Sequence, residues 1–287
     1  MELSDRSRYL TLDLLNQYDE HISAELLWEL VKEQFFTSHL SCMKPFSALH
    51  CVSYFGIADV ANDLIRSKKW DVNHRDGAGL TPLMWAARYG NEEVASLLLR
   101  HKHIQSDMPD TKYGRTTLSW AAGSGHEGVV RLFLGPQFIN PGSIGRQRRA
   151  PEVMSLLFGS KYVNLDWPDD GGQTPLSWAA CNGHGGIIKL LLERKDVSPD
   201  RPNNSGKTPL SWAALNGHDE AVKVLLERGD VNPDRPDYSR KTPLLWATLN
   251  GHDGSVKILL DRNDISPNTS DNDGKQPPLW AALNGHD

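Results

Sequence analysis

Cysteine is scarce in this sequence, and its scarcity excludes two classes of small domain. The 287 residues hold three cysteines, Cys42, Cys51 and Cys181, and no two of them have the C-x-x-C spacing. A disulfide framework or a cysteine-based zinc module needs more cysteines at closer spacing. We therefore expect reduced thiols in a cytosolic protein, with Cys51 and Cys181 at buried apolar positions.

The chain also lacks an excess of charge of one sign and any long apolar run. Its 31 basic and 36 acidic residues give a net charge of −5 and are interspersed, unlike the clustered basic residues of a nucleic-acid-binding surface. No apolar run approaches the ~18 residues of a membrane span, and residues 1–9 have no apolar signal-peptide core. These absences predict a soluble, cytoplasmic monomer that binds neither nucleic acid nor a membrane.

One tight basic run stands apart from this mixture. Arg146, Arg148 and Arg149 lie within four positions of one another. A solvated loop is the favoured interpretation, and the alternatives are a contact with an acidic partner or a nuclear localisation signal. The nucleus is therefore the second compartment to consider.

Tryptophan, by contrast, recurs inside a repeated motif. Residues 208–218 read T-P-L-S-W-A-A-L-N-G-H, in which Thr208 suits a helix N-cap and Pro209 suits the next position. Gly217 can take the positive φ that follows a helix, and residues 219–228 have apolar residues at helical spacing. The motif predicts a unit of helix, turn, helix and loop.

This unit recurs along most of the chain. Its tryptophan appears as Trp85, Trp120, Trp178, Trp212, Trp246 and Trp280, so the spacings are 35, 58, 34, 34 and 34 residues. A further copy begins at Ser47, with Cys51 in place of tryptophan. A period in the low thirties with T-P-L, A-A and G-H at these offsets resembles the ankyrin repeat over residues 46–287. The tryptophan-bearing form, with its V-N-P-D and V-S-P-D loops, looks most like the repeat tails of fungal proteins that carry a nucleotide-binding NACHT module.

The predicted fold is an all-α, ankyrin-type solenoid with one elongated series of repeats. Residues 1–45 do not fit the repeat and predict a helical N-terminal cap or the stub of an upstream domain. The remaining segments are repeats 1–3 in 46–134, a degenerate repeat or insertion in 135–173, repeats 5–7 in 174–275 and a truncated eighth repeat in 276–287.

The spacing of 58 residues admits two interpretations. It is 24 more than one period and 10 fewer than two, and residues 153–157 match a second helix. We interpret residues 142–173 as a fourth repeat that lacks its first helix, and the alternative is a looped insertion in the third repeat. Because a lone second helix loses packing partners, we expect this region to divide the chain into blocks 1–134 and 167–287.

No pattern in the sequence predicts catalysis, a cofactor or a metal. Residues 205–208 read S-G-K-T before a helix, but the phosphate-binding P-loop needs a glycine at position 201, where this chain has arginine. The histidines of the Gly-His turns recur one period apart, about 10 Å in a stack of repeats, which is too far to share an ion. We expect them to make structural hydrogen bonds across the turn. Ser177 and Ser211 have no base with an orienting acid placed beside them.

The resemblance implies a non-enzymatic scaffold that binds a protein partner through a concave face and hairpin loops. The alternative is the recognition tail of a larger nucleotide-binding protein whose catalytic part is missing. Candidate contacts are the residues that vary while the repeat frame is kept: Arg88, Tyr89, Tyr113, Arg115, Asp170, Gln173, Asn203, Asn204, Lys207, Asp237, Tyr238 and Lys241. Tyr113 and Tyr238 are the expected anchors, since aromatic residues at exposed positions are common hot spots.

The tryptophans themselves are expected in the core, because they recur on the apolar face of a helix and offer a large area to bury. Residues 276–287 would form one first helix without its second. Their apolar positions follow the interior pattern, so we expect a truncated or poorly ordered end.

Overall fold

The computed structural model describes residues 47–135 and 163–284. Thirteen helices and no strand are found in these residues, which confirms the all-α repeat solenoid. The predicted cap in residues 1–45, Cys42 and the basic run at Arg146, Arg148 and Arg149 lie outside the described residues.

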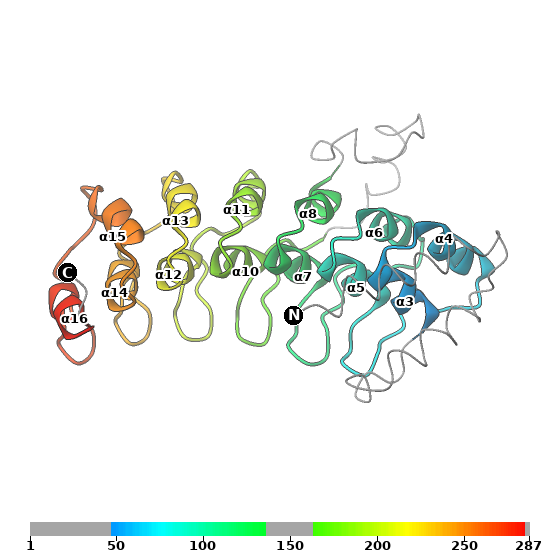
Figure 1. The fold of residues 1–287 in the computed structure, drawn as a ribbon, viewed down its shortest axis with the longest axis horizontal. Helices are drawn as coiled ribbons and strands as arrows, with labels where there is room; N and C mark the ends of the chain where they lie inside the picture. Colours follow the sequence, from blue (N-terminus) through cyan, green and yellow to red (C-terminus); the bar gives the residue numbers. More distant parts are fainter. Residues whose placement is uncertain (1–46, 136–162, 285–287) are drawn as a thin grey trace. The chain divides into compact units, whose positions relative to one another are not determined.

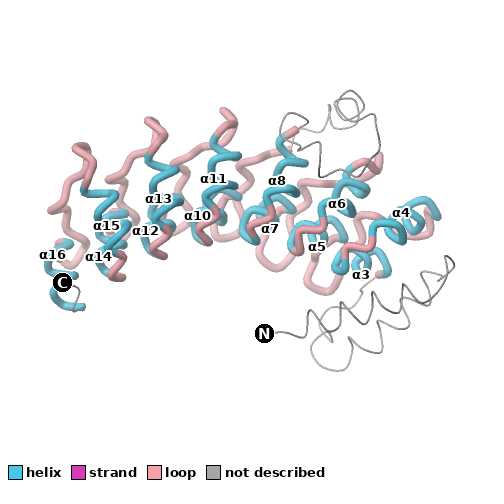
Figure 2. Tube along the Cα trace, turned by 45° about the horizontal axis from the view of Figure 1, so that its top comes forward, coloured by secondary structure: helices cyan, strands magenta, loops and turns pink. Residues whose placement is uncertain are grey.

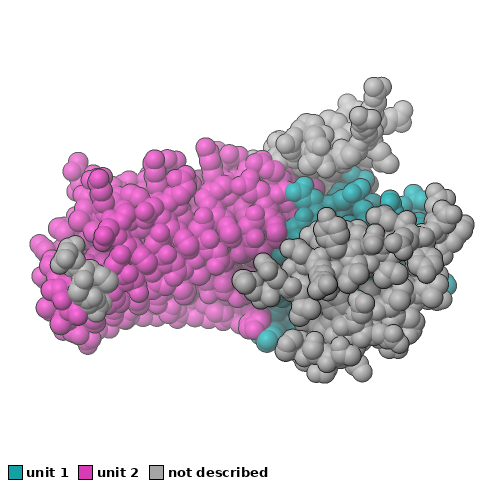
Figure 3. All heavy atoms as spheres, viewed as in Figure 1, with its two compact units in different colours: residues 1–106, 110–112 teal, residues 107–109, 113–287 magenta. Residues whose placement is uncertain are grey.

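The chain forms two compact units, coloured separately in Figure 3. Unit 1 consists of residues 1–106 and 110–112, and unit 2 of residues 107–109 and 113–287. The helices of unit 1 are α3 (Ala48–Phe55), α4 (Ala58–Ser67), α5 (Pro82–Arg88) and α6 (Glu92–Leu99). Those of unit 2 are α7 (Thr117–Ser124), α8 (Glu127–Leu134), α10 (Pro175–Cys181), α11 (Gly185–Leu192), α12 (Pro209–Leu215), α13 (Asp219–Leu226), α14 (Pro243–Leu249), α15 (Asp253–Leu260) and α16 (Pro277–Asn284).

Unit 2 is built from two rows of helices, shown in Figures 1 and 2. The first helices α7, α10, α12, α14 and α16 pack in sequence order in one row, and the second helices α8, α11, α13 and α15 pack in the other. The loops that precede the first helices project together from one edge of unit 2. In unit 1, α3 packs on α5 and α4 packs on α6.

Each first helix begins as the sequence predicts. Thr208 is the N-cap of α12, where its Oγ1 accepts a hydrogen bond from Ser211 N at 3.1 Å, and Pro209 follows it. Thr174 and Thr242 cap α10 and α14 in the same way. An N-cap of this kind satisfies a backbone N–H that has no partner inside the helix, and proline lacks that N–H altogether.

The histidine after each turn joins neighbouring repeats. His218 Nε2 donates to Cys181 O at 3.0 Å, and His252 Nε2 donates to Leu215 O at 2.9 Å. A carbonyl oxygen only accepts, so Nε2 carries the proton. The expected structural hydrogen bond is present, but it reaches the first helix of the preceding repeat rather than spanning the turn.

The second helices supply most of the bulky core side chains. Ile187, Ile188 and Leu191 of α11 are buried, as are Val222 and Leu225 of α13. The two alanines that follow the tryptophan in most repeats are also buried, and their small size lets the first helices approach one another closely.

The tryptophans differ in burial, which corrects the expectation that all six are core residues. Trp85 and Trp120 are buried. The other four are half-buried, namely Trp178, Trp212, Trp246 and Trp280. Their rings lie at the edge of the helix row, where cationic side chains of the hairpins cover them.

The repeats on either side of the 58-residue spacing pack directly against each other. Helix α7 packs on α10, and α8 packs on α11. His184 Nε2 donates to Gly123 O at 3.2 Å, which matches the bonds from His218 and His252 to the repeats that precede them. This packing favours a looped insertion over a half repeat stacked between α8 and α11, and we adopt the insertion as a proposal.

The same packing explains why the compact units do not divide at the long spacing. The division falls between residues 106 and 113, not between residues 134 and 167 as the sequence suggested. Helices α7 and α8 belong to unit 2 because they continue its two rows.

Helix α16 forms and packs on α14. Leu279 and Leu283 of α16 are exposed, and so is Leu260 at the end of α15. The interior sequence pattern of α16 therefore leaves apolar side chains at its surface.

Candidate partner-binding surface

A hairpin precedes each first helix from α5 to α16, and in all but one of these hairpins an aspartate side chain closes it. Before α14, Asp237 Oδ1 accepts hydrogen bonds from Ser239 N and Lys241 N, both at 2.9 Å. Asp237 Oδ2 accepts a hydrogen bond from Trp246 Nε1 at 3.1 Å. The same pattern recurs at Asp76, Asp169 and Asp271. The carboxylate thus fixes the tip of the hairpin and ties it to the first helix.

Backbone hydrogen bonds join the hairpins of unit 2 into a row. Asp170 N donates to Tyr113 O at 2.9 Å, and Asn204 N donates to Gly171 O at 2.9 Å. Tyr238 N continues the row by donating to Ser205 O at 3.1 Å. Each tip is therefore held both by its own helix and by the preceding tip, so the row is a rigid platform.

Cations from one hairpin neutralise the carboxylate of the next. Lys207 Nζ lies 3.5 Å from Asp237 Oδ2 and 4.6 Å from the centre of the Trp246 ring. Lys241 Nζ likewise lies 3.5 Å from Asp271 Oδ2, and it is 5.6 Å from the centre of the Trp246 ring of its own repeat. Cations over aromatic faces gain electrostatic attraction, and pairing with a buried carboxylate avoids an uncompensated charge.

Arginine fills the corresponding role at the junction between α7 and α10. The Arg115 guanidinium carbon lies 3.5 Å from the centre of the Trp178 ring, and Arg115 Nε is 3.7 Å from Asp169 Oδ2. The rings of Trp120 and Tyr113 lie 4.8 and 5.1 Å from the same guanidinium. Arg115 is thus enclosed by three aromatic rings.

The environment of Asp237 favours its charged form. Burial alone would raise its pKa, but the hydrogen bonds from Ser239, Lys241 N and Trp246 outweigh burial and hold the pKa of Asp237 below its ordinary value. The carboxylate is therefore ionised at neutral pH, where it pairs with Lys207 and accepts the hydrogen bond from Trp246.

One junction lacks both charges. Asn203 occupies the position of the hairpin aspartate, and Gln173 occupies the position of the cation that would pair with it. Asn203 Oδ1 still accepts from Ser205 N and Lys207 N at 2.9 and 3.0 Å, so the hairpin closes normally. The carboxylate oxygen that would accept from the indole is missing, and Trp212 Nε1 is buried without a hydrogen-bond partner. Gln173 Nε2 is likewise buried without one.

Comparison with known families identifies this architecture. A family model for three copies of the ankyrin repeat matches residues 49–143 and 146–237, and a model for a single ankyrin repeat matches residues 239–272. The chain belongs to the ankyrin-repeat family. No curated protein matches it. Ankyrin repeats generally mediate protein–protein interaction, and no finding extends the resemblance to the NACHT-associated tails.

Several of the predicted contact residues lie on the surface of the ankyrin hairpins. Tyr238 is 73% exposed and Tyr113 is 42% exposed. Asp170 and Asn204 are also exposed, at the tips between these two tyrosines. All four belong to unit 2, where hairpin-to-hairpin hydrogen bonds bring them into one row.

Two further predicted residues lie in unit 1. Tyr89 follows α5 and is 40% exposed. Its ring is 4.5 Å from that of Tyr54 and stacks on Trp85, with the Arg88 guanidinium 5.8 Å from the Tyr89 ring. Arg88 and Tyr89 are therefore part of an aromatic cluster at the ends of α3 and α5.

The remaining predicted residues take part in the ankyrin frame, and the burial of Asn203 and Asp237 contradicts their assignment as contacts. Asn203 and Asp237 are buried because their side chains close the hairpins. Lys207 and Lys241 are mostly buried because they pair with the next hairpin carboxylate. Arg115 and Gln173 are half-buried at the equivalent position. Three junctions thus have a charged pair at these positions, and a fourth has the neutral residues Gln173 and Asn203.

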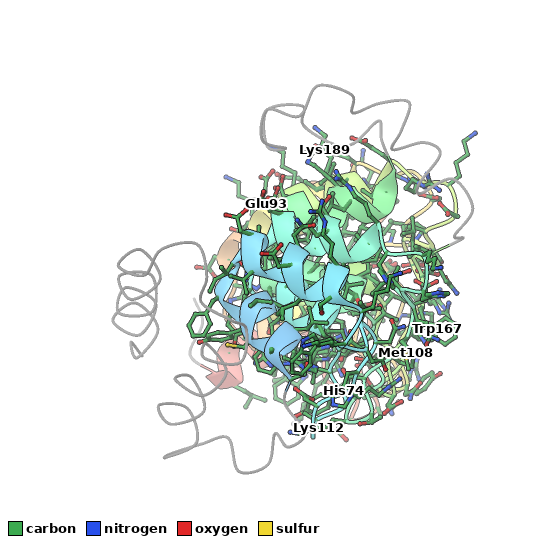
Figure 4. The ribbon with its side chains drawn as sticks, turned by 90° about the vertical axis from the view of Figure 1, so that its right-hand side faces the viewer. His74, Glu93, Met108, Lys112, Trp167 and Lys189 are labelled. Carbon is green, nitrogen blue, oxygen red and sulfur yellow. The ribbon has the colours of Figure 1, made fainter. Side chains whose placement is uncertain are left out.

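Sequence reasoning missed two exposed residues of the ankyrin hairpins. Trp167 is 40% exposed and stands where the next two repeats have Arg201 and Arg235. Figure 4 shows Trp167 on the loop side, away from Lys189 on α11. Arg240 is exposed and stands where the neighbouring hairpins have glycine. Comparing each repeat position by position would have found both, since each is the exception at its position.

The serine hydroxyls and cysteine thiols that could act as nucleophiles are buried or hydrogen-bonded within the repeats. The buried hydroxyls of Ser177 and Ser211 lie 3.1 and 3.0 Å from the hydroxyls of their N-cap threonines. Burial raises the pKa of Cys51 to about 12 and also raises that of Cys181, so neither thiol is a ready nucleophile. Neither is in a disulfide.

A search of the described residues finds no metal-binding group of three or more His, Cys, Asp or Glu side chains. None of the helices in residues 47–135 and 163–284 has the length and apolar character that crossing a membrane requires.

Proposed function

We propose that this ankyrin-repeat chain is a non-enzymatic scaffold that binds a protein partner through the hairpin tips of unit 2. The supporting observation is the row of tips held by hydrogen bonds, with Tyr113 and Tyr238 exposed at two of those tips. Trp167 adds a third exposed aromatic ring close in sequence to the tip at Asp170. Aromatic residues on a rigid support make effective anchors because little conformational freedom is lost on binding.

The frame beneath the tips explains why they are suited to recognition. Each hairpin is fixed by its Asp or Asn side chain. Lys207 and Lys241 link consecutive hairpins by pairing with the aspartate of the next one. The side chain of Asp170 can then vary without changing the backbone that carries it, whereas Asn204 Nδ2 also donates to Asp170 O at 2.8 Å. We propose Tyr113, Asp170, Asn204 and Tyr238 as the contact residues, with Trp167 added.

The test is capture of partners with the full chain and with the double variant Tyr113→Ala/Tyr238→Ala. The control is Lys189→Ala/Lys257→Ala, which removes two exposed side chains from the second helices α11 and α15. Proteins captured from a lysate of the source organism by the chain and by the control, but lost with the tyrosine variant, would support the proposal. Equal capture by all three proteins would contradict it.

The proposal includes the statement that the chain is not an enzyme. The alternative, a recognition tail of a nucleotide-binding NACHT-type protein, has only the sequence resemblance in its favour. A turnover assay with ATP and GTP on the isolated chain tests this point, and hydrolysis above that of a heat-denatured sample would contradict a purely scaffolding role.

A further inference from the structure

One hairpin tip of unit 2 has a non-glycine residue at a left-handed backbone position. Arg240 has φ of 60°, in the left-handed region, whereas the corresponding residues of the other hairpins are Gly79, Gly114, Gly172, Gly206 and Gly274. The position follows a tight turn, where the left-handed conformation is needed and glycine adopts it without a steric penalty. An arginine here is strained, so the sequence places it against the local preference of the fold.

The side chain at this position also crowds the next hairpin. A Cβ atom added to Gly172 would lie 2.7 Å from Asn204 N, and one added to Gly206 would lie 2.7 Å from Tyr238 N. Arg240 carries such a Cβ atom, and the hydrogen bonds to the following hairpin are longer than elsewhere. Asn272 N to Ser239 O is 3.2 Å, compared with 2.9 Å from Asn204 N to Gly171 O and 3.1 Å from Tyr238 N to Ser205 O. Asn272 Nδ2 to Tyr238 O is 3.3 Å, whereas Asn204 Nδ2 to Asp170 O is 2.8 Å.

The strained residue presents an available positive charge. Arg240 is exposed, and its guanidinium makes no hydrogen bond, ion pair or ring contact with any residue in 47–135 or 163–284. Lys207 and Lys241, by contrast, are paired with Asp237 and Asp271. The next tip carries Asp273 at the position of Ser239, and no ion pair joins it to Arg240 in this structure.

An exposed aromatic ring accompanies this charge two residues earlier in the same turn. Tyr238 is 73% exposed. A Cβ atom added to Gly206 would lie 2.8 Å from Tyr238 Cδ1, so one edge of the ring lies against the preceding hairpin. The tip therefore combines a positioned aromatic ring with an unpaired guanidinium.

We propose that the tip formed by Tyr238, Ser239 and Arg240 binds an acidic side chain of a protein partner. The guanidinium donates two parallel hydrogen bonds to a partner Asp or Glu carboxylate, and the Tyr238 ring packs on the adjoining apolar atoms. This inference rests on the proposed function and names the chemistry of one anchor. A single unpaired cation beside the acidic residue Asp273 fits one carboxylate better than the series of phosphates in a nucleic acid.

The test uses the full chain, with a phage library of random linear peptides as the probe. The peptides selected on this chain are synthesised, and their dissociation constants are measured by fluorescence anisotropy for four variants. Arg240→Gly removes both the charge and the strain, Arg240→Gln removes the charge but keeps a side chain in the left-handed conformation, Tyr238→Ala removes the ring, and Lys257→Ala removes an exposed charge from α15 as the control.

We expect selected peptides rich in Asp and Glu. Arg240→Gly and Arg240→Gln should each weaken their binding by about tenfold or more, as expected for losing hydrogen bonds to a charged group. Tyr238→Ala should weaken it as well, and Lys257→Ala should leave it unchanged. Arg240→Gly should also raise the Tm, because glycine relieves the strain, whereas Arg240→Gln should leave the Tm close to its original value. A rise in stability together with a loss of binding is not expected of a purely structural residue.

Three results would overturn the inference. Selected peptides that bind the Arg240 variants as tightly as the unchanged protein would place the anchor elsewhere and leave the proposed function standing. Tighter binding of a single-stranded DNA oligonucleotide than of any selected peptide would assign the tip to another class of ligand. If selection on this protein enriches no peptide above the unselected library, both this inference and the proposed function are contradicted.

Discussion

The indole N–H groups of Trp246 and Trp212 have different surroundings, although both tryptophans occupy the same position of the repeat. Trp246 Nε1 donates to Asp237 Oδ2 at 3.1 Å, whereas Trp212 Nε1 is buried without an acceptor. Phenylalanine at either position keeps an aromatic ring and removes the N–H. We expect Trp246→Phe to lower the free energy of unfolding by about 1 to 2 kcal/mol, because a hydrogen bond to a carboxylate is lost.

The matched variant Trp212→Phe should have a smaller effect, since it also removes an unsatisfied buried donor. Urea unfolding of both variants measures the difference directly. An equal loss of stability in the two variants would show that the indole hydrogen bond contributes nothing and that only the ring matters.

Two aspartates of unit 2 respond to pH in opposite directions. The pKa of Asp237 is below its ordinary value, so its contribution to stability is present above about pH 4, the unfolded value, and is lost as the pH falls through the folded value. Burial raises the pKa of Asp200 despite the opposing effect of Arg235. In the pH range between its unfolded and folded values, the folded protein binds more protons, so Asp200 adds stability as the pH falls.

Substitution by asparagine should separate these effects. Asp237→Asn should make the loss of stability below about pH 4 less steep. The variant should still close its hairpin, because Asn203 does so at the same position of the preceding repeat. Asp200→Asn should make the loss of stability on acidification steeper in the pH range just above about pH 4, because it removes the opposing gain. Tm measured across this range checks both slopes, and a pair of variants with the slope of the unchanged protein would contradict the two assignments.

At the scale of elements, an arginine joins the ends of neighbouring second helices. Arg228 makes two hydrogen bonds to Asp230, from Nε at 2.9 Å and from Nη2 at 2.6 Å. Its Nη1 also donates to Leu192 O, at the end of α11. The last carbonyl groups of a helix have no partner inside it and carry partial negative charge, so an arginine from the next repeat stabilises that end.

Arg194 provides a matched comparison for this contact. It makes the same paired hydrogen bonds to Asp196, and no bond from it to a carbonyl of another repeat is present among the described residues. Arg228→Ala should therefore lower the free energy of unfolding by about 1 to 2 kcal/mol, whereas Arg194→Ala should cost less than about 1 kcal/mol, the range for an exposed pair. Chemical denaturation measures both, and equal losses would mean that the bond to Leu192 O adds nothing.

The local features of these elements could be predicted from the sequence because they depend on neighbouring residues. Thr208, Pro209 and Gly217 determine where α12 begins and ends through backbone geometry alone. The bond from Trp246 to Asp237 was not predictable in this way, because it depends on how the hairpin folds back on the helix nine residues later. Without this bond in view, the variation between Asn203 and Asp237 was interpreted as a sign of contact with a partner.

Asn203 shows the physical reason why that assumption failed. Asn203 stands where other hairpins have an aspartate, and Gln173 stands where the paired cation would be, so two neutral residues replace two charged ones. The substitution preserves charge balance inside the frame and says nothing about a partner. Tyr238 was predicted correctly to be exposed, because the preceding hairpins have the polar residues Asp170 and Asn204 at the same position of the repeat.

At the scale of the whole molecule, the long spacing is the one interruption of the repeat, and a replacement tests whether it is an insertion. By the repeat alignment, Leu134 and Val163 correspond to Leu192 and Val197, which only the four residues 193–196 separate. Replacing residues 135–162 with the sequence Glu-Arg-Lys-Asp of residues 193–196 removes 28 residues, adds four and so shortens the chain by 24, the excess of 58 over 34.

Because α7 packs on α10 and α8 packs on α11, this replacement should leave the two helix rows of unit 2 intact. The stability of a repeat array is close to a sum over repeats and the interfaces between neighbours, and no interface among the described helices is removed. We therefore expect a single cooperative unfolding transition with a Tm within a few degrees of the original value. The replacement changes only the entropy of closing the loop, and this entropy depends weakly on loop length. Loss of cooperativity, or a Tm lower by many degrees, would mean that residues 135–162 supply packing that the stack of α8 on α11 needs, as a half repeat would.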